Sequence, residues 1–173
     1  RDGVINIDTG YIKSWKDFSF IPGSIDAMRQ LQENNYNIFI ITNQSGIARG
    51  RIGIHEYSVL EKKIEKFLDN LSIKIVKTYF CPHHPDGKVE AYRKICSCRK
   101  PEPGMILKAA LEYDIDIKNS ILVGDKISDI ECSENSGIKA SYLIRSKYNK
   151  THNIIKYDDL KSCVDYHLNN YVR

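Results

Sequence analysis

A cluster of thiol and imidazole side chains has the spacing of a metal site. Cys81 and His83 are one residue apart, and after twelve intervening positions come Cys96 and Cys98, again one residue apart. Three thiolates and one imidazole can hold zinc in a closed tetrahedral shell, the structural type of site, because no position is left for water. His84 could replace His83, although the Cys-x-His spacing favours His83. The plain alternative is a set of free thiols on a mobile loop.

The stretch around this cluster, residues 81–102, is rich in Cys, His, Pro and Gly and shows no regular period. A loop this long inside a compact domain is usually functional or tied down. Zinc would close a loop that has no hydrophobic core of its own and would position Arg99 and Lys100, directly after the last ligand. The other cysteines, Cys132 and Cys163, lie in helix-like segments and are expected to be small buried hydrophobes.

A second group of candidate residues follows short apolar runs. Thr42 and Asn43 end the run that begins at Ile38, and Asp125 follows the run that ends at Gly124. In parallel α/β sheets, ligands bind beyond the carboxyl ends of the strands, so polar residues at these positions are candidates for a site. Taken singly, each has an ordinary reading, as a helix cap or as a turn.

The elements that must position these residues alternate between helix-like and strand-like stretches. Apolar periodicity predicts a helix capped by Ser24, a helix over 55–71, a helix that Pro103 opens and that runs to Tyr113, a helix over 128–136 that Gly137 ends, and a last helix that starts at Asp158. Short apolar runs predict strands at 38–42, 73–80, 120–124 and 141–144. Strands separated by helices favour right-handed crossovers, so we expect a doubly wound parallel sheet with helices on both faces. At 173 residues the chain should form one domain, residues 1–173, with the zinc loop at about 81–102.

Composition narrows the class of protein. The formal net charge is +4, with basic residues scattered along the chain, so the charge could attract an anionic substrate but forms no basic stripe for nucleic acid. No apolar run approaches the roughly 18 residues of a membrane span, and no signal peptide pattern is evident. We therefore expect a cytoplasmic protein without membrane or nucleic-acid partners, and a monomer because no heptad seam is present.

Four segments occur in the order of the four motifs of the haloacid dehalogenase superfamily, and the chain resembles its phosphatases. The segments are Arg1-Asp2-Gly3-Val4-Ile5-Asn6, Ile41-Thr42-Asn43-Gln44, Arg99-Lys100 and Val123-Gly124-Asp125-Lys126. The resemblance implies a Rossmann-like fold with a minimal cap. The first motif of the superfamily has two aspartates flanking one residue, and only the second, Asp2, is printed here. A nucleophilic aspartate on the central strand is therefore expected immediately before Arg1, outside the numbering.

The resemblance also implies the role of each matching residue. Asp2 would act as general acid and base, two residues along and on the same side of the extended chain as the nucleophile. Mg²⁺ would be held by Asp125, the nucleophile and the backbone carbonyl of Asp2. Thr42 and Lys100 would stabilise the transferring phosphoryl group. Asp129 is a further candidate, as a partner of these groups.

Within the superfamily, the zinc loop and minimal cap resemble the branch of heptose bisphosphate phosphatases and histidinol-phosphate phosphatases. The heptose group is indicated by Asp8 to Tyr11, Thr42 to Gly50, Cys81 to Pro85 and Gly124 to Lys126; histidinol enzymes typically differ after Thr42 to Gln44 and carry Arg in place of Lys126. By this resemblance the substrate would contact Asp8, Thr9, Gly10, Tyr11, Thr42, Asn43, Gln44, Ser45, Arg99, Lys100 and Lys126. Arg49 could meet a second phosphate.

The activity implied is removal of the 7-phosphate of D-glycero-D-manno-heptose 1,7-bisphosphate, on the route to nucleotide-activated heptose for bacterial surface polysaccharide. The alternatives are a histidinol-phosphate phosphatase, a 3′-phosphatase acting on nucleic-acid ends, which would need a basic stripe, and a zinc-stapled binding module without catalysis.

Overall fold

The structure is a computed structural model that describes residues 1–151 and 154–171. The helices are α1 (Ser24–Glu33), α2 (Ser45–Ala48), α3 (Ile54–Asn70), α4 (Gly104–Tyr113), α5 (Ile127–Ser136) and α6 (Leu160–Tyr171), and the strands are β1 (Ile38–Asn43), β2 (Ile75–Cys81), β3 (Ile121–Gly124), β4 (Ala140–Ile144) and β5 (Lys156–Tyr157). Short 3-10 helices lie at Trp15–Asp17, Glu90–Tyr92 and Ile117–Asn119. The predicted alternation of helices and strands is confirmed, whereas α2 and β5 are too short to leave a periodic signal.

The observed ends of the helices show where local sequence signals predict helix boundaries correctly and where they do not. Gly137 ends α5 in the left-handed conformation, at φ 87°, as predicted. The prediction that Ser24 caps α1 is wrong: Gly23 is the cap, and Ser24 lies inside the helix with its hydroxyl buried and unpaired. The last helix begins at Leu160, two residues after the predicted start at Asp158.

The strands pair in parallel, which confirms the α/β class, but they form two sheets. One sheet joins β1 to β2, and the other has the order β3-β4-β5. In the first, Thr42 lies opposite Phe80 and Asn43 opposite Cys81. The polar end of β1 is therefore level with the start of the loop at residues 81–102, called the cysteine loop from here on. In the second, Gly124 lies opposite Leu143.

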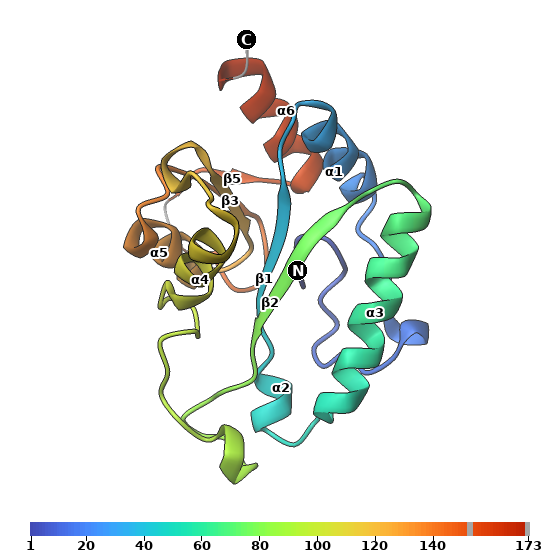
Figure 1. The fold of residues 1–173 in the computed structure, drawn as a ribbon, viewed down its shortest axis with the longest axis vertical. Helices are drawn as coiled ribbons and strands as arrows, with labels where there is room; N and C mark the ends of the chain where they lie inside the picture. The colour runs from blue at the N-terminus through green and yellow to red at the C-terminus, as the bar shows by residue number, and fades with distance from the viewer. Residues whose placement is uncertain (152–153, 172–173) are drawn as a thin grey trace.

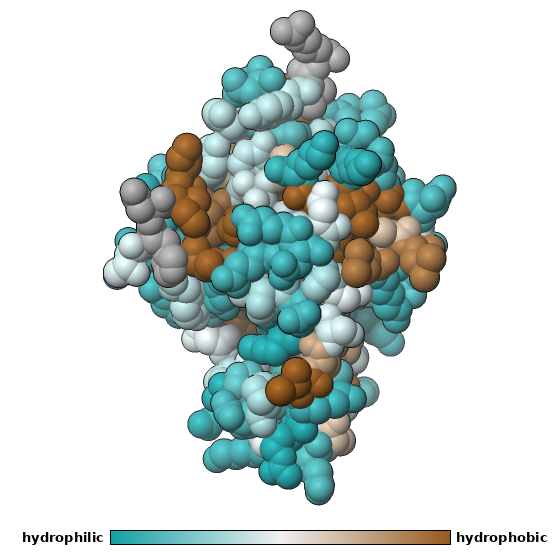
Figure 2. All heavy atoms as spheres, turned by 90° about the vertical axis from the view of Figure 1, so that its left-hand side faces the viewer, coloured by the Kyte–Doolittle hydropathy of each residue, from teal (hydrophilic) through white to brown (hydrophobic). Residues whose placement is uncertain are grey.

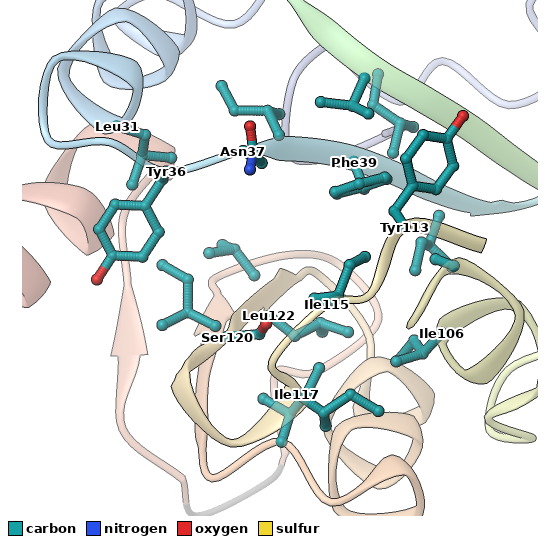
Figure 3. A pocket seen from close by; sticks show the side chains of 18 of the residues that line it. Leu31, Tyr36, Asn37, Phe39, Ile106, Tyr113, Ile115, Ile117, Ser120 and Leu122 are labelled. Atoms are coloured by element: carbon teal, nitrogen blue, oxygen red, sulfur yellow. The ribbon is translucent and has the colours of Figure 1, made fainter. Parts of the chain in front are cut away.

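A slot separates β1 from β3. It has a volume of about 940 Å³ and is lined by Ile38 to Ile41 of β1 and by Ile121 to Val123 of β3. Figure 3 shows apolar side chains from both walls pointing into it, among them Phe39 and Leu122. Each of these two strands pairs on one side only, so the slot lies between two strands that each have a free edge.

Helices cover the strands from both sides. The helices α3 and α4 both contact β2, and Figure 1 shows them on opposite sides of the β1–β2 pair. A core cluster that includes Met28, Leu60, Ile64 and Val164 joins α1, α3 and α6 to the strands. The loop after β2 extends away from this body, at the bottom of Figure 1.

In the part of the chain that is described, none of the helices is long and apolar enough to cross a bilayer. On the face shown in Figure 2, the described apolar side chains form separate groups divided by hydrophilic ones.

Candidate active site and metal centre

A cavity of about 290 Å³ lies at the carboxyl ends of β1 and β3, where the sequence places its polar candidates. Its lining residues come from segments far apart in the chain and include Arg1, Asp2, Thr42, Asn43, Ser45, Arg99, Lys100, Asp125, Lys126, Ser128 and Asp129. The structure thus brings together one residue or more from each of the four segments singled out in the sequence. Ser128 is the one polar lining residue that sequence reasoning did not name.

The carboxylate of Asp2 is held by hydrogen bonds from several directions. Its Oδ1 accepts from Arg1 Nη2 at 2.8 Å and from Asn6 Nδ2 at 3.0 Å, and its Oδ2 accepts from Gln44 Nε2 at 2.9 Å. Burial alone would raise the pKa of this carboxyl group, but the Arg1 guanidinium and the Asn6 amide outweigh it, so the pKa lies below its usual value. These contacts fix the orientation of the Asp2 carboxylate and favour its ionised form.

A buried acid on α3 stabilises the arrangement of Arg1 and Asp2. Glu61 forms an ion pair with Arg1, whose guanidinium also lies 5.7 Å from the centre of the Tyr57 ring. Sequence reasoning missed Glu61, although a signal existed: it occupies the apolar stripe of α3 together with Tyr57 and Ile64. A charged residue on the buried face of a helix needs a partner, because burying an unpaired charge is costly.

Asp125 lies where a cation would be held. Its carboxylate is packed against the backbone of Gly3: a Cβ built on Gly3 would be 2.5 Å from Asp125 Oδ2. That Oδ2 atom is buried and has no hydrogen-bond partner. Burial raises the pKa of Asp125 to about 6, against the opposing charge of Lys126. An unpartnered carboxylate oxygen in a site of oxygen donors fits Mg²⁺, which prefers all-oxygen ligands.

Lys100 is fixed with its ammonium group in the cavity. Its Nζ lies 2.6 Å from Asp129 Oδ1 and donates to the carbonyl of Ile41 at 2.9 Å. The side-chain amide of Asn43 pairs with the backbone of Lys100, donating to its carbonyl and accepting from its N–H, both at 3.1 Å. Asn43 thereby couples the end of β1 to the end of the cysteine loop. Burial would raise the pKa of Asp129, but Lys100 lowers it below its usual value.

Thr42 and Asp129 also line the cavity and take part in its hydrogen bonds. Thr42 is buried, and its hydroxyl accepts from Gln44 Nε2 at 2.9 Å, so Gln44 links Thr42 to Asp2. Asp129 Oδ2 accepts from the backbone N–H groups of Asp125 and Lys126, each at 3.0 Å. This carboxylate therefore both shapes the turn into α5 and pairs with Lys100.

The segment from Asp8 to Tyr11 does not line the cavity. It is an exposed turn closed by a hydrogen bond from Gly10 N to Asp8 Oδ1 at 2.8 Å, and Thr9 lies on its surface. The ring of Tyr11 packs against Gly46 of α2, where a Cβ would be 2.7 Å from Tyr11 Cδ1. Within this segment, Tyr11 is thus in contact with α2.

The basic residues near the cysteine loop lie toward the rim. Arg49 Nη2 lies 3.0 Å from His84 Nε2, and Arg99 donates to the carbonyl of His83 at 3.2 Å. Both arginines lower the pKa of His84, after the larger effect of burial. Arg99 borders the cavity, whereas Arg49 is not among its lining residues.

The four predicted zinc ligands lie together. The ligand atoms of Cys81, His83, Cys96 and Cys98 are all within 4.8 Å of one another, and the three Sγ atoms are 3.3–3.6 Å apart. Tetrahedral ligands with Zn–S bonds of about 2.3 Å would lie about 3.8 Å apart, so the cage has the right size. Its imidazole is that of His83, because the ring nitrogens of His84 face Arg49 and the Asp86 N–H. Burial lowers the pKa of His83, which favours the neutral form that binds metal.

The parallel α/β fold and a site built from four ordered segments define this chain as a phosphatase of the haloacid dehalogenase type. The family described as polynucleotide kinase 3 phosphatase matches residues 4–163. The D-glycero-beta-D-manno-heptose-1,7-bisphosphate 7-phosphatase of Escherichia coli (strain K12) is 40% identical over 84% of this chain and 76% of its own length. The D-glycero-alpha-D-manno-heptose-1,7-bisphosphate 7-phosphatase of Photorhabdus laumondii is 43% identical over 84% of this chain and 80% of its own length.

The chain belongs to the family of D-glycero-D-manno-heptose-1,7-bisphosphate 7-phosphatases, which confirms the resemblance found in the sequence. Among solved structures, the D,D-heptose 1,7-bisphosphate phosphatase of B. bronchiseptica, in complex with magnesium and phosphate, is similar with a TM-score of 0.84. The identity is 29%, and the match covers 98% of this chain and 95% of that one.

Proposed function

We propose that the protein removes the 7-phosphate of D-glycero-D-manno-heptose 1,7-bisphosphate and leaves the 1-phosphate in place. The observation that carries this proposal is the cavity in which Asp2, Thr42, Lys100 and Asp125 meet at the ends of two strands. Relatives at 40–43% identity carry this activity in their names, for either anomer. The anomer preferred by this chain therefore has to be measured.

Magnesium would be held by Asp125, by the backbone carbonyl of Asp2 and by an upstream nucleophile. The free, buried Oδ2 of Asp125 supports this assignment. When bound, Mg²⁺ would neutralise charge on the phosphoryl oxygens. Lys100 would contact those oxygens from the other side of the cavity, with Asp129 and the Ile41 carbonyl keeping its ammonium group in place.

The nucleophile is proposed to be an aspartate immediately before Arg1. Arg1 lines the cavity together with Lys100 and Asp129, which supports a residue joined to its backbone nitrogen lying at the cavity. The slot between β1 and β3 meets this cavity, because Arg1 and Lys100 line both. A strand seated in the slot would pair with the free edges of β1 and β3, unite the two sheets and deliver its last residue to the site.

The reaction would then run in two steps with these residues. A carboxylate oxygen of the upstream aspartate forms a bond to phosphorus while the bond from phosphorus to the sugar oxygen breaks, and Asp2 protonates the leaving oxygen. Asp2 then removes a proton from water, whose oxygen attacks phosphorus and releases inorganic phosphate and the free carboxylate. Asp2 can donate only in its protonated form, which the negative charge of the bound phosphate would favour by raising its pKa.

Zinc is proposed to be held by Cys81, His83, Cys96 and Cys98 with a mechanical role. The ligand cage lies next to Arg99 and Lys100 in sequence, and Asn43 fastens the backbone of Lys100 to β1. Closing the loop would therefore fix the position of Lys100 in the cavity.

The remaining proposed substrate contacts are Asp8 to Tyr11, Thr42 to Ser45, Arg99 and Lys126. Arg49 would contact the distal phosphate.

The deciding experiment measures phosphate release by the full-length protein, with its native residues upstream of Arg1, in the presence of Mg²⁺. The substrates are the two anomers of the heptose bisphosphate, histidinol phosphate and a 3′-phosphorylated oligonucleotide. We expect the highest kcat/KM with a heptose bisphosphate, and ³¹P spectra should show loss of the 7-phosphate. A higher value with histidinol phosphate or the oligonucleotide would select that rival, and no Mg²⁺-dependent release from any substrate would favour the binding module.

Two further expectations concern the setting of the enzyme. We propose a cytoplasmic location, where its sugar phosphate substrate would be found, and a monomeric state. Sedimentation of the purified protein at micromolar concentration tests the second; a dimer mass would contradict it.

A further inference from the structure

The segment after β4 is fastened to the metal-binding end of β3. Ser146 Oγ donates to the backbone carbonyl of Asp125 at 2.6 Å, and Asn149 Nδ2 donates to the same carbonyl at 2.9 Å. Asn149 is fully buried, also donates to the carbonyl of Ile144 and accepts from the Ser146 N–H. All the hydrogen bonds of its amide oxygen and nitrogen are thus used to hold this turn in one place.

Tyr148 lies between these two anchors and reaches to the rim of the site. Its hydroxyl donates to Asp8 Oδ2 at 2.8 Å, and the Nζ of Lys126 lies 4.3 Å from the centre of its ring. Lys147 adds a contact from its Nζ to the carbonyl of Asp8 at 3.5 Å. One tyrosine therefore touches two residues that the sequence assigns to the substrate, Asp8 from the N-terminal turn and Lys126 from the end of β3.

These contacts would fix the distance between the carboxylate of Asp8, a hydrogen-bond acceptor, and the ammonium group of Lys126. Asp8 has two other restraints: its Oδ1 accepts from the N–H of Gly10, and its backbone carbonyl lies 3.5 Å from Lys147 Nζ. Lys126 has a long side chain whose ammonium group is restrained through cation–π attraction to the Tyr148 ring. Without Tyr148, both side chains would have to be ordered by the substrate, and binding would lose affinity accordingly.

We propose that Tyr148 is a specificity-determining residue that positions Asp8 and Lys126 to hold the sugar end of a polyhydroxylated phosphate ester. This inference rests on the proposed function. Asp8 would accept hydrogen bonds from sugar hydroxyl groups, and Lys126 would pair with the substrate's negative charge. A phosphate ester without hydroxyl groups, such as para-nitrophenyl phosphate, has nothing for Asp8 to hold and depends less on this arrangement.

Two variants separate the two contacts of Tyr148. Tyr148→Phe removes only the hydrogen bond to Asp8, and Tyr148→Leu also removes the aromatic face under Lys126. In the full-length protein, we expect Tyr148→Phe to raise KM for the heptose bisphosphate about 3- to 10-fold with kcat within twofold, the range for loss of one positioning hydrogen bond. Tyr148→Leu should raise the KM for the heptose bisphosphate further. The ratio of kcat/KM for the heptose bisphosphate to that for para-nitrophenyl phosphate should fall in both variants.

The matched control is Tyr166→Phe, which removes the hydroxyl of a half-exposed tyrosine on α6, away from the cavity. It should leave that ratio unchanged. An unchanged KM for the heptose bisphosphate in both Tyr148 variants, or an equal loss on both substrates, would overturn the proposal.

A second readout does not depend on the identity of the substrate. Amide hydrogen exchange at Thr9, Gly10 and Tyr11 should be faster in Tyr148→Phe than in the unchanged protein or in Tyr166→Phe, because the turn loses its tether. Equal exchange in all three proteins would overturn the positioning role. If exchange is faster but the unchanged protein shows no preference for the heptose bisphosphate, the proposed substrate is wrong while the positioning of Asp8 by Tyr148 stands.

Discussion

The carboxylate of Asp125 lies directly against the backbone of Gly3, with no room for a side chain between them. Gly3 has φ 79°, in the left-handed region, and a Cβ there would be 2.5 Å from Asp125 Oδ2. Two separate requirements, conformation and close approach, therefore select glycine at this position. The contact also holds the segment that carries Asp2 against the end of β3.

Replacing Gly3 with alanine should therefore damage the site beyond its effect on the backbone. Gly137→Ala is the matched control, because Gly137 also has a positive φ, of 87°, but open space around it. We expect Gly137→Ala to lower the free energy of unfolding by about 1–2 kcal/mol with kcat retained. Gly3→Ala should cost more stability and remove most activity, measured by urea denaturation and phosphate release. Equal effects of the two changes would contradict the close contact.

Asp125→Asn should abolish magnesium-dependent activity while the fold persists. The amide keeps the shape of the side chain but loses the charge that a cation needs, so we expect kcat to fall by at least about 10²–10³-fold. Asp158→Asn, at an exposed ion pair with Arg145, is the control and should change kcat by less than twofold. Mg²⁺ titrations of activity would show the difference, and near-normal turnover by Asp125→Asn would argue against this residue as a ligand.

Cys98→Ser should release zinc and weaken substrate binding more than it weakens the sheets. The loop positions Lys100 through Asn43, whereas the two sheets have their own apolar contacts. We expect one zinc per chain in the unchanged protein, much less in Cys98→Ser, and a KM raised several-fold with little change in far-ultraviolet circular dichroism. Cys163→Ala, a buried cysteine outside the cage, should keep its zinc. An unchanged KM after verified zinc loss would contradict the mechanical role.

Glu61→Ala should strongly destabilise the protein. The side chains of Arg1 and Glu61 are 1% and 9% exposed, and removing one partner leaves the other charge buried without its counter-ion. Such losses typically cost about 3–5 kcal/mol, and the remaining pair of Arg1 with Asp2 places this one at the lower end. Glu65→Ala, one turn along on the exposed face of α3, should stay within about 0.5 kcal/mol. Urea denaturation of both variants tests this, and similar values would contradict it.

His167 should make stability depend on pH. Its ring nitrogens lie 2.7 Å from Tyr36 Oη and 2.8 Å from Tyr142 Oη, and burial lowers its pKa. The unfolded chain therefore binds a proton more readily than the folded protein, so this contribution to stability is complete above the unfolded pKa of about 6.5 and is lost as pH falls below it. The free energy of unfolding should drop between pH 7.5 and 5.5, and by less in His167→Gln. An equal drop in both proteins would rule out His167 as the cause.

The zinc cage shows how much of a site local sequence can reveal. Two close pairs of ligands, Cys81 with His83 and Cys96 with Cys98, already define the donor set through their spacing. The same spacing favours His83 over His84, and the fold places the His83 ring beside the three thiols. Glu61 could not be found in this way, because its partner Arg1 is 60 positions away.

Local periodicity and spacing determined the alternation of helices and strands and the identity of the candidate ligands, and the family came from the resemblance of four ordered segments to known motifs. The tertiary structure decided which side chains meet. It placed Tyr148 against Asp8 and Lys126 and used Asn43 to hold Lys100. Such pairings depend on how distant segments pack, and packing is a property of the whole chain that no short stretch of sequence encodes.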